Sequence, residues 1–110
     1  MEKENQNNKL ECGIIIGQII DFEFYKTLFD PVRSEILKFL AVQGNKNITE
    51  IAKNFTQDRS VISRHLELMS RYRILNKTKQ SRSTFYEINK NLILEKFEAT
   101  TKNLKELMEK

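Results

Sequence analysis

Side chains able to read nucleic-acid bases recur along the stretch Thr56 to Tyr72. At 100° per residue this stretch forms a helix with a polar face and an opposite apolar face. The polar face comprises Arg59, Ser60, Ser63, Arg64 and Glu67, and the apolar face comprises Ile62, Leu66 and Met69. Arginine and serine near the start of a short helix supply donors and acceptors that can reach base edges in a major groove. We therefore expect Arg59, Ser60, Ser63 and Arg64 to contact DNA bases.

The residues just before this stretch predict where the helix begins. Asp58 is suited to be the N-cap, because its carboxylate can accept hydrogen bonds from the free amides of the first turn. The helix is then expected to begin at Arg59. Upstream, Asn47 and Glu50 have the spacing of a capping box, which predicts a third, short helix from Ile48 to about Phe55. Two short helices separated by a tight turn predict a helix-turn-helix with the second as reader.

A basic hairpin is predicted directly after the reader helix. Ile74 and Leu75 precede a polar run, Asn76 to Ser83, which is followed by the strand-like residues Thr84 to Ile88. Side chains in the turn before the reader helix and near the hairpin tip are expected to contact the DNA backbone, adding affinity but little sequence information. These candidates are Gln57, Lys77, Lys79 and Arg82.

Charge is concentrated in the same region. The segment from Asp58 to Lys90 has eight basic and three acidic residues, a net +5, whereas the rest of the chain is close to neutral at −1. A basic block confined to one third of a small domain favours a polyanionic partner, with a modestly basic solvated surface as the alternative.

Two long helices are predicted at the ends of the chain. Apolar residues from Ile14 to Phe29 recur at three- and four-residue steps, and the final segment, Asn89 to Lys110, carries another apolar stripe. Between them, Asp30 and Pro31 begin a second helix that ends near Gly44. The end helices offer more apolar surface than one small core needs, which favours a homodimer. The expected interface residues are Ile16, Ile20, Phe24, Ile93, Phe97, Leu104 and Met108.

Length and composition exclude several classes of protein. The 110 residues suffice for one folded domain, expected over residues 13–110, after a polar, mobile tail over residues 1–12. The single cysteine, Cys12, excludes an intrachain disulfide and favours the reducing cytoplasm. No apolar run reaches the ~20 residues of a membrane span, and no signal peptide is evident. One histidine, His65, and no glycine-rich phosphate loop argue against an enzyme, and no cofactor is expected.

Four segments together resemble the arsenic-repressor (ArsR) family of winged helix-turn-helix regulators. The residues that carry the resemblance are FYKTLFDPVRSEILKFL (Phe24 to Leu40), ITEIAKNF (Ile48 to Phe55), RSVISRHLELM (Arg59 to Met69) and STFYEIN (Ser83 to Asn89). The first resembles the family's opening signature, and the others resemble its third helix, reader helix and second wing strand. The resemblance spans most of the chain, from about Phe22 to Lys110.

The resemblance implies a mainly α fold with a small β-hairpin, in the order α-α-α-α-β-β-α. It also implies a homodimeric repressor whose end helices form the interface and whose reader helices enter successive major grooves. The chain departs from the family in two respects. The wing turn has no glycine, and the third and last helices lack the cysteine and histidine ligands with which many members bind metals, so metal sensing is not supported.

The sequence therefore predicts a sequence-specific DNA-binding transcriptional regulator that forms a homodimer, needs no cofactor and does not enter a membrane. The alternative is a winged-helix module that binds protein partners within a transcription complex and touches DNA weakly or not at all.

Overall fold

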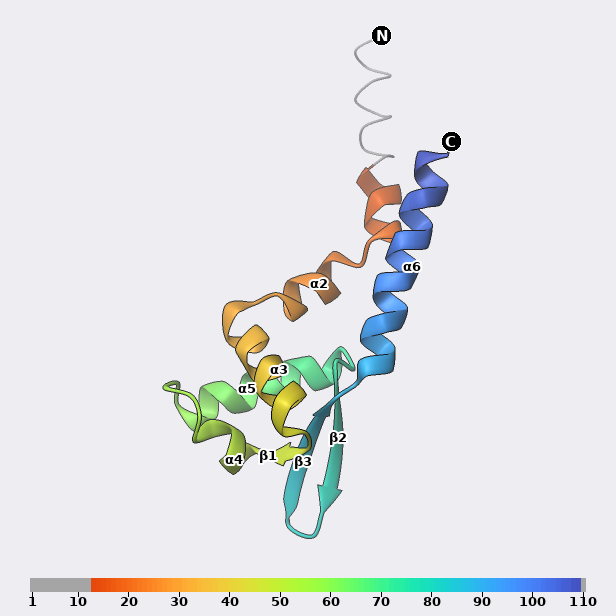
Figure 1. Cartoon of the computed structure of the whole chain (residues 1–110). Helices are drawn as coiled ribbons and strands as arrows, with labels where there is room; N and C mark the ends of the chain where they lie inside the picture. The colour runs from red at the N-terminus through yellow and green to blue at the C-terminus, as the bar shows by residue number, and fades with distance from the viewer. Residues whose placement is uncertain (1–12, 110) are drawn as a thin grey trace.

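The computed structural model describes residues 13–109, so the predicted tail over residues 1–12, with Cys12, lies outside the described residues. A helical segment at residues 13–19 comes first in Figure 1. It is followed by α2 (Phe22–Leu28), α3 (Pro31–Gln43), β1 (Lys46–Asn47), α4 (Ile48–Ala52), α5 (Arg59–Arg71), β2 (Leu75–Gln80), β3 (Ser83–Ile88) and α6 (Lys90–Met108). This order confirms the predicted winged helix-turn-helix with its β-hairpin.

The prediction of one continuous helix from Ile14 to Phe29 is wrong. The helix stops before Asp21, whose side chain caps α2 by accepting a hydrogen bond from the backbone N–H of Phe24 at 3.1 Å. The same carboxylate pairs with Lys96 Nζ at 2.8 Å, which ties this cap to α6. Aspartate favours an N-cap over a helix interior because its oxygen competes for backbone amides. The apolar periodicity continued through the break and so concealed it.

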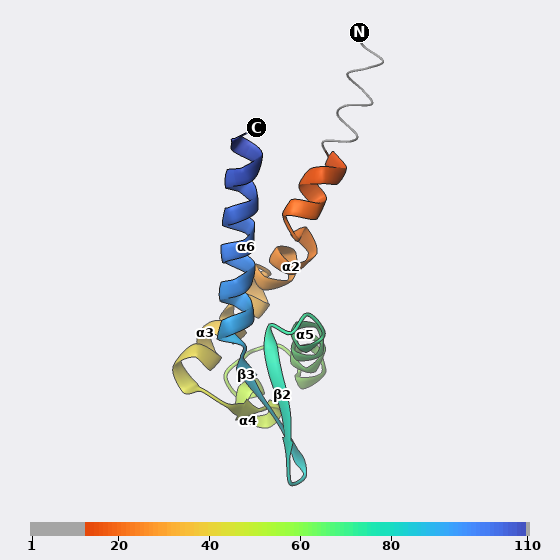
Figure 2. The same ribbon diagram turned by 90° about the vertical axis from the view of Figure 1, so that its right-hand side faces the viewer.

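The first helical segment and α6 both extend away from the rest of the molecule, and they diverge toward their outer ends (Figures 1 and 2). They meet where Asn103 Nδ2 donates to the backbone carbonyl of Ile19 at 3.4 Å. Below this point the hydroxyl of Tyr25 donates to the carbonyl of Lys96 at 3.0 Å and lies 2.7 Å from the hydroxyl of Thr100. These polar contacts join α2 to α6.

Both ends of α3 are as predicted. Asp30 caps its start by accepting from the N–H groups of Val32 and Arg33, with Pro31 in the first turn. Gly44 ends the helix with φ +77°, a conformation that glycine adopts without the steric cost of a side chain.

The hairpin belongs to an antiparallel sheet with the strand order β1-β3-β2. The two-residue strand β1, which pairs with β3, was not predicted. In the hairpin, the strands are joined by a two-residue turn, and Ser81 takes φ +55° there. A serine thus takes the left-handed conformation for which glycine is the easier residue.

One core holds the helices and the wing together. It comprises Phe24, Leu28, Ile36, Leu40, Ile51, Ile62, Leu66, Met69, Ile74, Leu75 and Tyr86. Phe24 is only 1 % exposed in this core, so its expected place in a dimer interface is wrong. The reason is the break at Asp21, which turns α2 so that Phe24 faces the core rather than the outer side of the end helices.

Candidate nucleic-acid interface

The reader helix α5 begins at Arg59, as predicted, and its apolar face is fixed in the core. Ile62, Leu66 and Met69 are fully buried, which confirms the predicted apolar side. Asp58 precedes the helix, but its carboxylate makes no capping hydrogen bond, contrary to the prediction. Its backbone carbonyl instead accepts from the N–H groups of Val61 and Ile62. The carboxylate is exposed, so water can satisfy it in place of the helix amides.

The predicted base-contacting side chains lie on the opposite, outer face of α5. Arg59, Ser60 and Arg64 are exposed, and Ser63 is half-buried. They occupy the first two turns of the helix, so a groove that received its N-terminal half would meet all four.

The reader helix ends in a Schellman motif. The N–H of Ile74 donates to the carbonyl of Met69 at 2.9 Å, and the N–H of Arg73 donates to the carbonyl of Ser70 at 3.0 Å. Arg73 adopts φ +60°, the position where glycine is usual. Ile74 then enters the core, which fixes the direction of the chain from the helix into the wing.

The turn before α5 follows a short, well-capped helix. In α4, Asn47 Oδ1 accepts from the N–H of Glu50, and Glu50 Oε1 accepts from the N–H of Asn47, which confirms the predicted capping box. In the turn, Gln57 is half-buried, and its Oε1 is enclosed without a hydrogen-bond partner among residues 13–109. Its side chain is therefore less free to reach a phosphate than the exposed lysines of the wing.

The wing and the reader helix border one hollow of about 230 Å³. Arg59 and Ser63 line it from α5, Arg82 lines it from the wing turn, and Thr49 lines it from α4. The fold therefore brings a predicted base-contacting arginine and a predicted backbone-contacting arginine to the same opening. Two arginines at one opening suit a phosphate, which can accept several hydrogen bonds from arginine.

The cations of the wing differ in their surroundings. Lys79 and Arg82 are exposed and make no ion pair with the described residues. Lys77 instead pairs with Glu67 of α5, with 2.8 Å between Nζ and Oε1. This hydrogen bond raises the pKa of Lys77 and lowers the pKa of Glu67. Among the wing residues predicted to contact the DNA backbone, Lys77 therefore already has an ion-pair partner within the chain.

Arg33 joins the reader helix to α2 and α3. Its Nε donates to the backbone carbonyl of Thr27 at 2.7 Å, and one terminal nitrogen lies 3.2 Å from Nδ1 of His65. Burial of the imidazole and the nearby Arg33 charge lower the pKa of His65. No role was predicted for Arg33 from the sequence, although it directly follows the helix start that Asp30 and Pro31 mark.

The segment from residue 30 to 77, which contains the helix-turn-helix, matches the family model described as bacterial regulatory protein, arsR family. An uncharacterized HTH-type transcriptional regulator of Methanocaldococcus jannaschii is 32% identical over 66 residues, which cover 60% of this chain and 74% of that relative. The chain belongs to the arsR family. This membership confirms the resemblance drawn from the four sequence segments and identifies a DNA-binding transcriptional regulator, not an enzyme.

Solved structures of transcriptional regulators share the fold. The transcriptional repressor PagR of Bacillus anthracis is 32% identical, with a TM-score of 0.57 over 63% of this chain and 78% of that one. The ArsR family transcriptional regulator RHA00566 is 27% identical, with a TM-score of 0.60 over 78% of this chain and 84% of that one.

Two further observations concern metal binding and membrane spanning. Within residues 13–109, no three side chains of the His, Cys, Asp and Glu types come together in a group that could hold a metal ion. Across the same residues, no helix is both long and apolar enough to cross a bilayer.

Proposed function

We propose that the chain is a homodimeric repressor that occupies a pseudo-palindromic DNA operator. The observation that carries this proposal is the outer face of α5, where Arg59 and Arg64 are exposed while the opposite face is locked into the core. In this role Arg59, Ser60, Ser63 and Arg64 contact base edges, the arginines by paired hydrogen bonds to guanine and the serines by single ones. PagR, a relative of known structure, is described as a transcriptional repressor, which supports the direction of regulation.

The wing supplies contacts to the backbone in this proposal. Lys79 and Arg82 are exposed at or near the tip of the hairpin and contact phosphates beside the groove. Gln57 contributes from the turn before α5 through its side-chain NH2, the group of that side chain that can donate to a phosphate oxygen. Lys77 lies on the same strand as Lys79, but its bond to Glu67 makes it a poorer donor to DNA.

The two end helices form the dimer interface. Residues 13–19 and α6 carry exposed apolar side chains that the core of one protomer does not cover: Ile14, Ile15, Ile16, Leu94, Phe97, Leu104, Leu107 and Met108. Of the other expected interface residues, Ile20 and Ile93 are half-buried within the protomer. Within residues 13–109, the outer pair of helices extends beyond the central winged domain (Figure 1), which supports two copies joined along α6.

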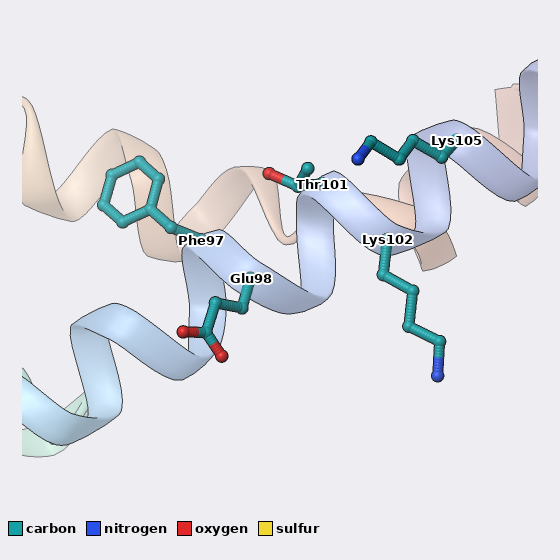
Figure 3. A pocket seen from close by; sticks show the side chains of 5 residues that line it. All are labelled: Phe97, Glu98, Thr101, Lys102 and Lys105. Carbon is teal, nitrogen blue, oxygen red and sulfur yellow. The ribbon is translucent and has the colours of Figure 1, made fainter.

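One side of α6 carries both apolar and charged side chains. An open hollow of about 420 Å³ is lined by Phe97, Glu98, Thr101, Lys102 and Lys105. Figure 3 shows these side chains along α6. Phe97 also packs against Tyr25, with 5.2 Å between ring centroids. A partner helix can therefore extend an aromatic cluster that the protomer leaves half-covered, with charged residues at its rim.

Regulation in this proposal does not use the metal sites found in other members of the family. Neither α4 nor α6 contains a cysteine or a histidine, the residue types that zinc and thiophilic ions prefer. The regulator is expected to act in the cytoplasm, where it meets the chromosome.

The experiment that tests the proposal combines selection from random DNA duplexes at near-physiological salt with light scattering of the purified protein. The proposal predicts enrichment of an inverted repeat by a particle of about 26 kDa, twice the mass of the 13.1 kDa chain. A dimer places its two half-sites about one helical turn apart, so the spacing of the repeat is a further prediction. If nothing is enriched and binding disappears as salt rises, the proposal fails, and a protein-binding winged helix becomes the better reading.

A further inference from the structure

A carboxylate lies on the face of the reader helix that is proposed to meet DNA. Glu67 follows Ser63 by four residues, so it occupies the same side of α5 one turn further along. An unpaired carboxylate there would face the negative backbone of DNA, which repels it. In this structure a lysine of the wing pairs with the Glu67 carboxylate and neutralises its charge.

Two side chains of the wing converge on Glu67. Lys77 and Tyr86 are directly opposed across β2 and β3, so their side chains leave the same face of the hairpin. Lys77 Nζ lies 2.8 Å from Glu67 Oε1, and the Tyr86 hydroxyl donates to the same oxygen at 3.3 Å. The ring of Tyr86 is buried in the core, whereas the lysine and the glutamate are about half exposed. Glu67 therefore joins the reader helix to both strands of the wing.

We propose that Glu67 is a positioning residue that fixes the wing against the reader helix and withholds Lys77 from the phosphates of bound DNA. The proposal rests on the DNA-binding function proposed above. Within it, the wing contacts phosphates through Lys79 and Arg82, while Lys77 serves as an internal partner. Fixing the wing aligns its phosphate contacts with the base contacts of α5, whereas a mobile wing still reaches phosphates but holds no single register with the bases.

The salt dependence of DNA binding distinguishes this role of Glu67 from a purely structural role. Each phosphate that a protein cation neutralises adds about 0.9 to the slope of log affinity against log salt. A lysine paired within the protein in both free and bound states adds nothing to that slope. The number of wing cations that contact phosphate can therefore be counted by comparing variants.

The experiment measures binding of the full chain to its selected inverted repeat and to a random duplex of equal length, over a series of salt concentrations. The double variant Glu67→Gln/Lys77→Gln removes the pair without changing net charge, and we expect it to keep the wild-type slope. The matched control Lys79→Gln is expected to flatten the slope by about 0.9 per protomer. The single variant Glu67→Gln frees Lys77 and is expected to steepen the slope by about 0.9 per protomer.

Specificity provides the second readout. The double variant is expected to bind the inverted repeat less tightly relative to random DNA than the wild type does, because the wing is no longer held in register. The proposal is overturned if the double variant flattens the slope as much as Lys79→Gln does, since Lys77 would then contact phosphate in the wild type. It is also overturned if Glu67→Gln leaves the slope unchanged. If the wild type itself shows no preference for any duplex, the DNA-binding proposal fails, and this one fails with it.

Discussion

Arg33 and His65 are in direct contact, with 3.2 Å between a terminal guanidinium nitrogen and Nδ1 of the imidazole. A guanidinium group can only donate hydrogen bonds, so Nδ1 is the acceptor and carries no proton. The same arginine donates to the carbonyl of Thr27 and lies 3.8 Å from the carboxylate of Asp30. The middle of the reader helix is thereby joined to the junction between α2 and α3.

Replacing Arg33 is expected to destabilise the whole domain. The variant Arg33→Met keeps much of the length of the side chain but leaves the Thr27 carbonyl and the His65 ring without their donor, which costs about 1–3 kcal/mol. Denaturant unfolding measures the loss. Lys38→Met is the control, because Lys38 is exposed on the same helix and pairs only with Glu35 at the surface. Equal losses for the two variants would show that the contacts of Arg33 contribute nothing beyond an exposed charge.

Stability is expected to fall between pH 7.5 and 5.5. Burial and the Arg33 charge lower the pKa of His65 below its ordinary value of 6.5, so the unfolded chain binds a proton in this range more readily than the folded one does. The stabilisation is complete above pH 6.5 and is lost as the pH falls through the lowered pKa. The pKa values of Asp21 and Glu67 are also lowered, but their effects begin below pH 4.5. Thermal unfolding of the wild type and of His65→Gln at both pH values measures the effect, and the variant should lose less. A parallel loss would assign the pH dependence to other groups.

The end of the reader helix offers a paired test of backbone strain. Arg73 adopts φ +60°, which costs a residue with a side chain about 1 kcal/mol relative to glycine, so Arg73→Gly is expected to stabilise the protein by up to that amount. Arg71→Gly, two residues earlier and within α5, should instead destabilise it by about 1 kcal/mol. Both variants remove the same charge, so a difference of sign in denaturant unfolding isolates the backbone effect. Destabilisation by both variants would contradict the strain at Arg73.

The proposed dimer predicts that charge on α6 separates the protomers. Leu104→Asp places a carboxylate in the apolar stripe of α6 and is expected to yield a particle of about 13 kDa in light scattering. Val42→Asp is the control, because Val42 is also an exposed apolar residue but lies at the end of α3, outside the proposed interface. An unchanged mass for Leu104→Asp, or monomers from Val42→Asp, would place the interface elsewhere.

Local signals in the sequence were sufficient for most of the fold. Caps at Asp30 and Asn47, the apolar periodicity of α5 and the change to a strand pattern after Tyr72 each have a cause within a few residues. The break at Asp21 was missed because the apolar pattern runs through it, and the cap is supported by Lys96, far along the chain. The strand β1 was missed because two residues carry no periodicity, and only the pairing with β3 defines them.

The candidate DNA interface, like the fold, could be predicted from the sequence only in part. The polar face of α5 follows from helical spacing alone, so Arg59 and Arg64 could be predicted from the sequence. The different surroundings of Lys77 and Lys79 could not be predicted from the sequence. These surroundings depend on which lysine lies beside Glu67 when the hairpin packs on α5. Likewise Arg33 and His65 are 32 residues apart in sequence and become partners only through the core.

The central claim is that the outer face of α5 reads base sequence, and Arg64→Ala tests it most directly. Affinities of the wild type and the variant are measured on the selected operator, on operators changed one base pair at a time, and on random DNA of equal length. If Arg64 reads guanine, the variant should lose about 1–3 kcal/mol on the operator, lose much less on random DNA, and become indifferent to one base pair in each half-site. An equal loss on operator and random DNA, with every base preference retained, would contradict the claim.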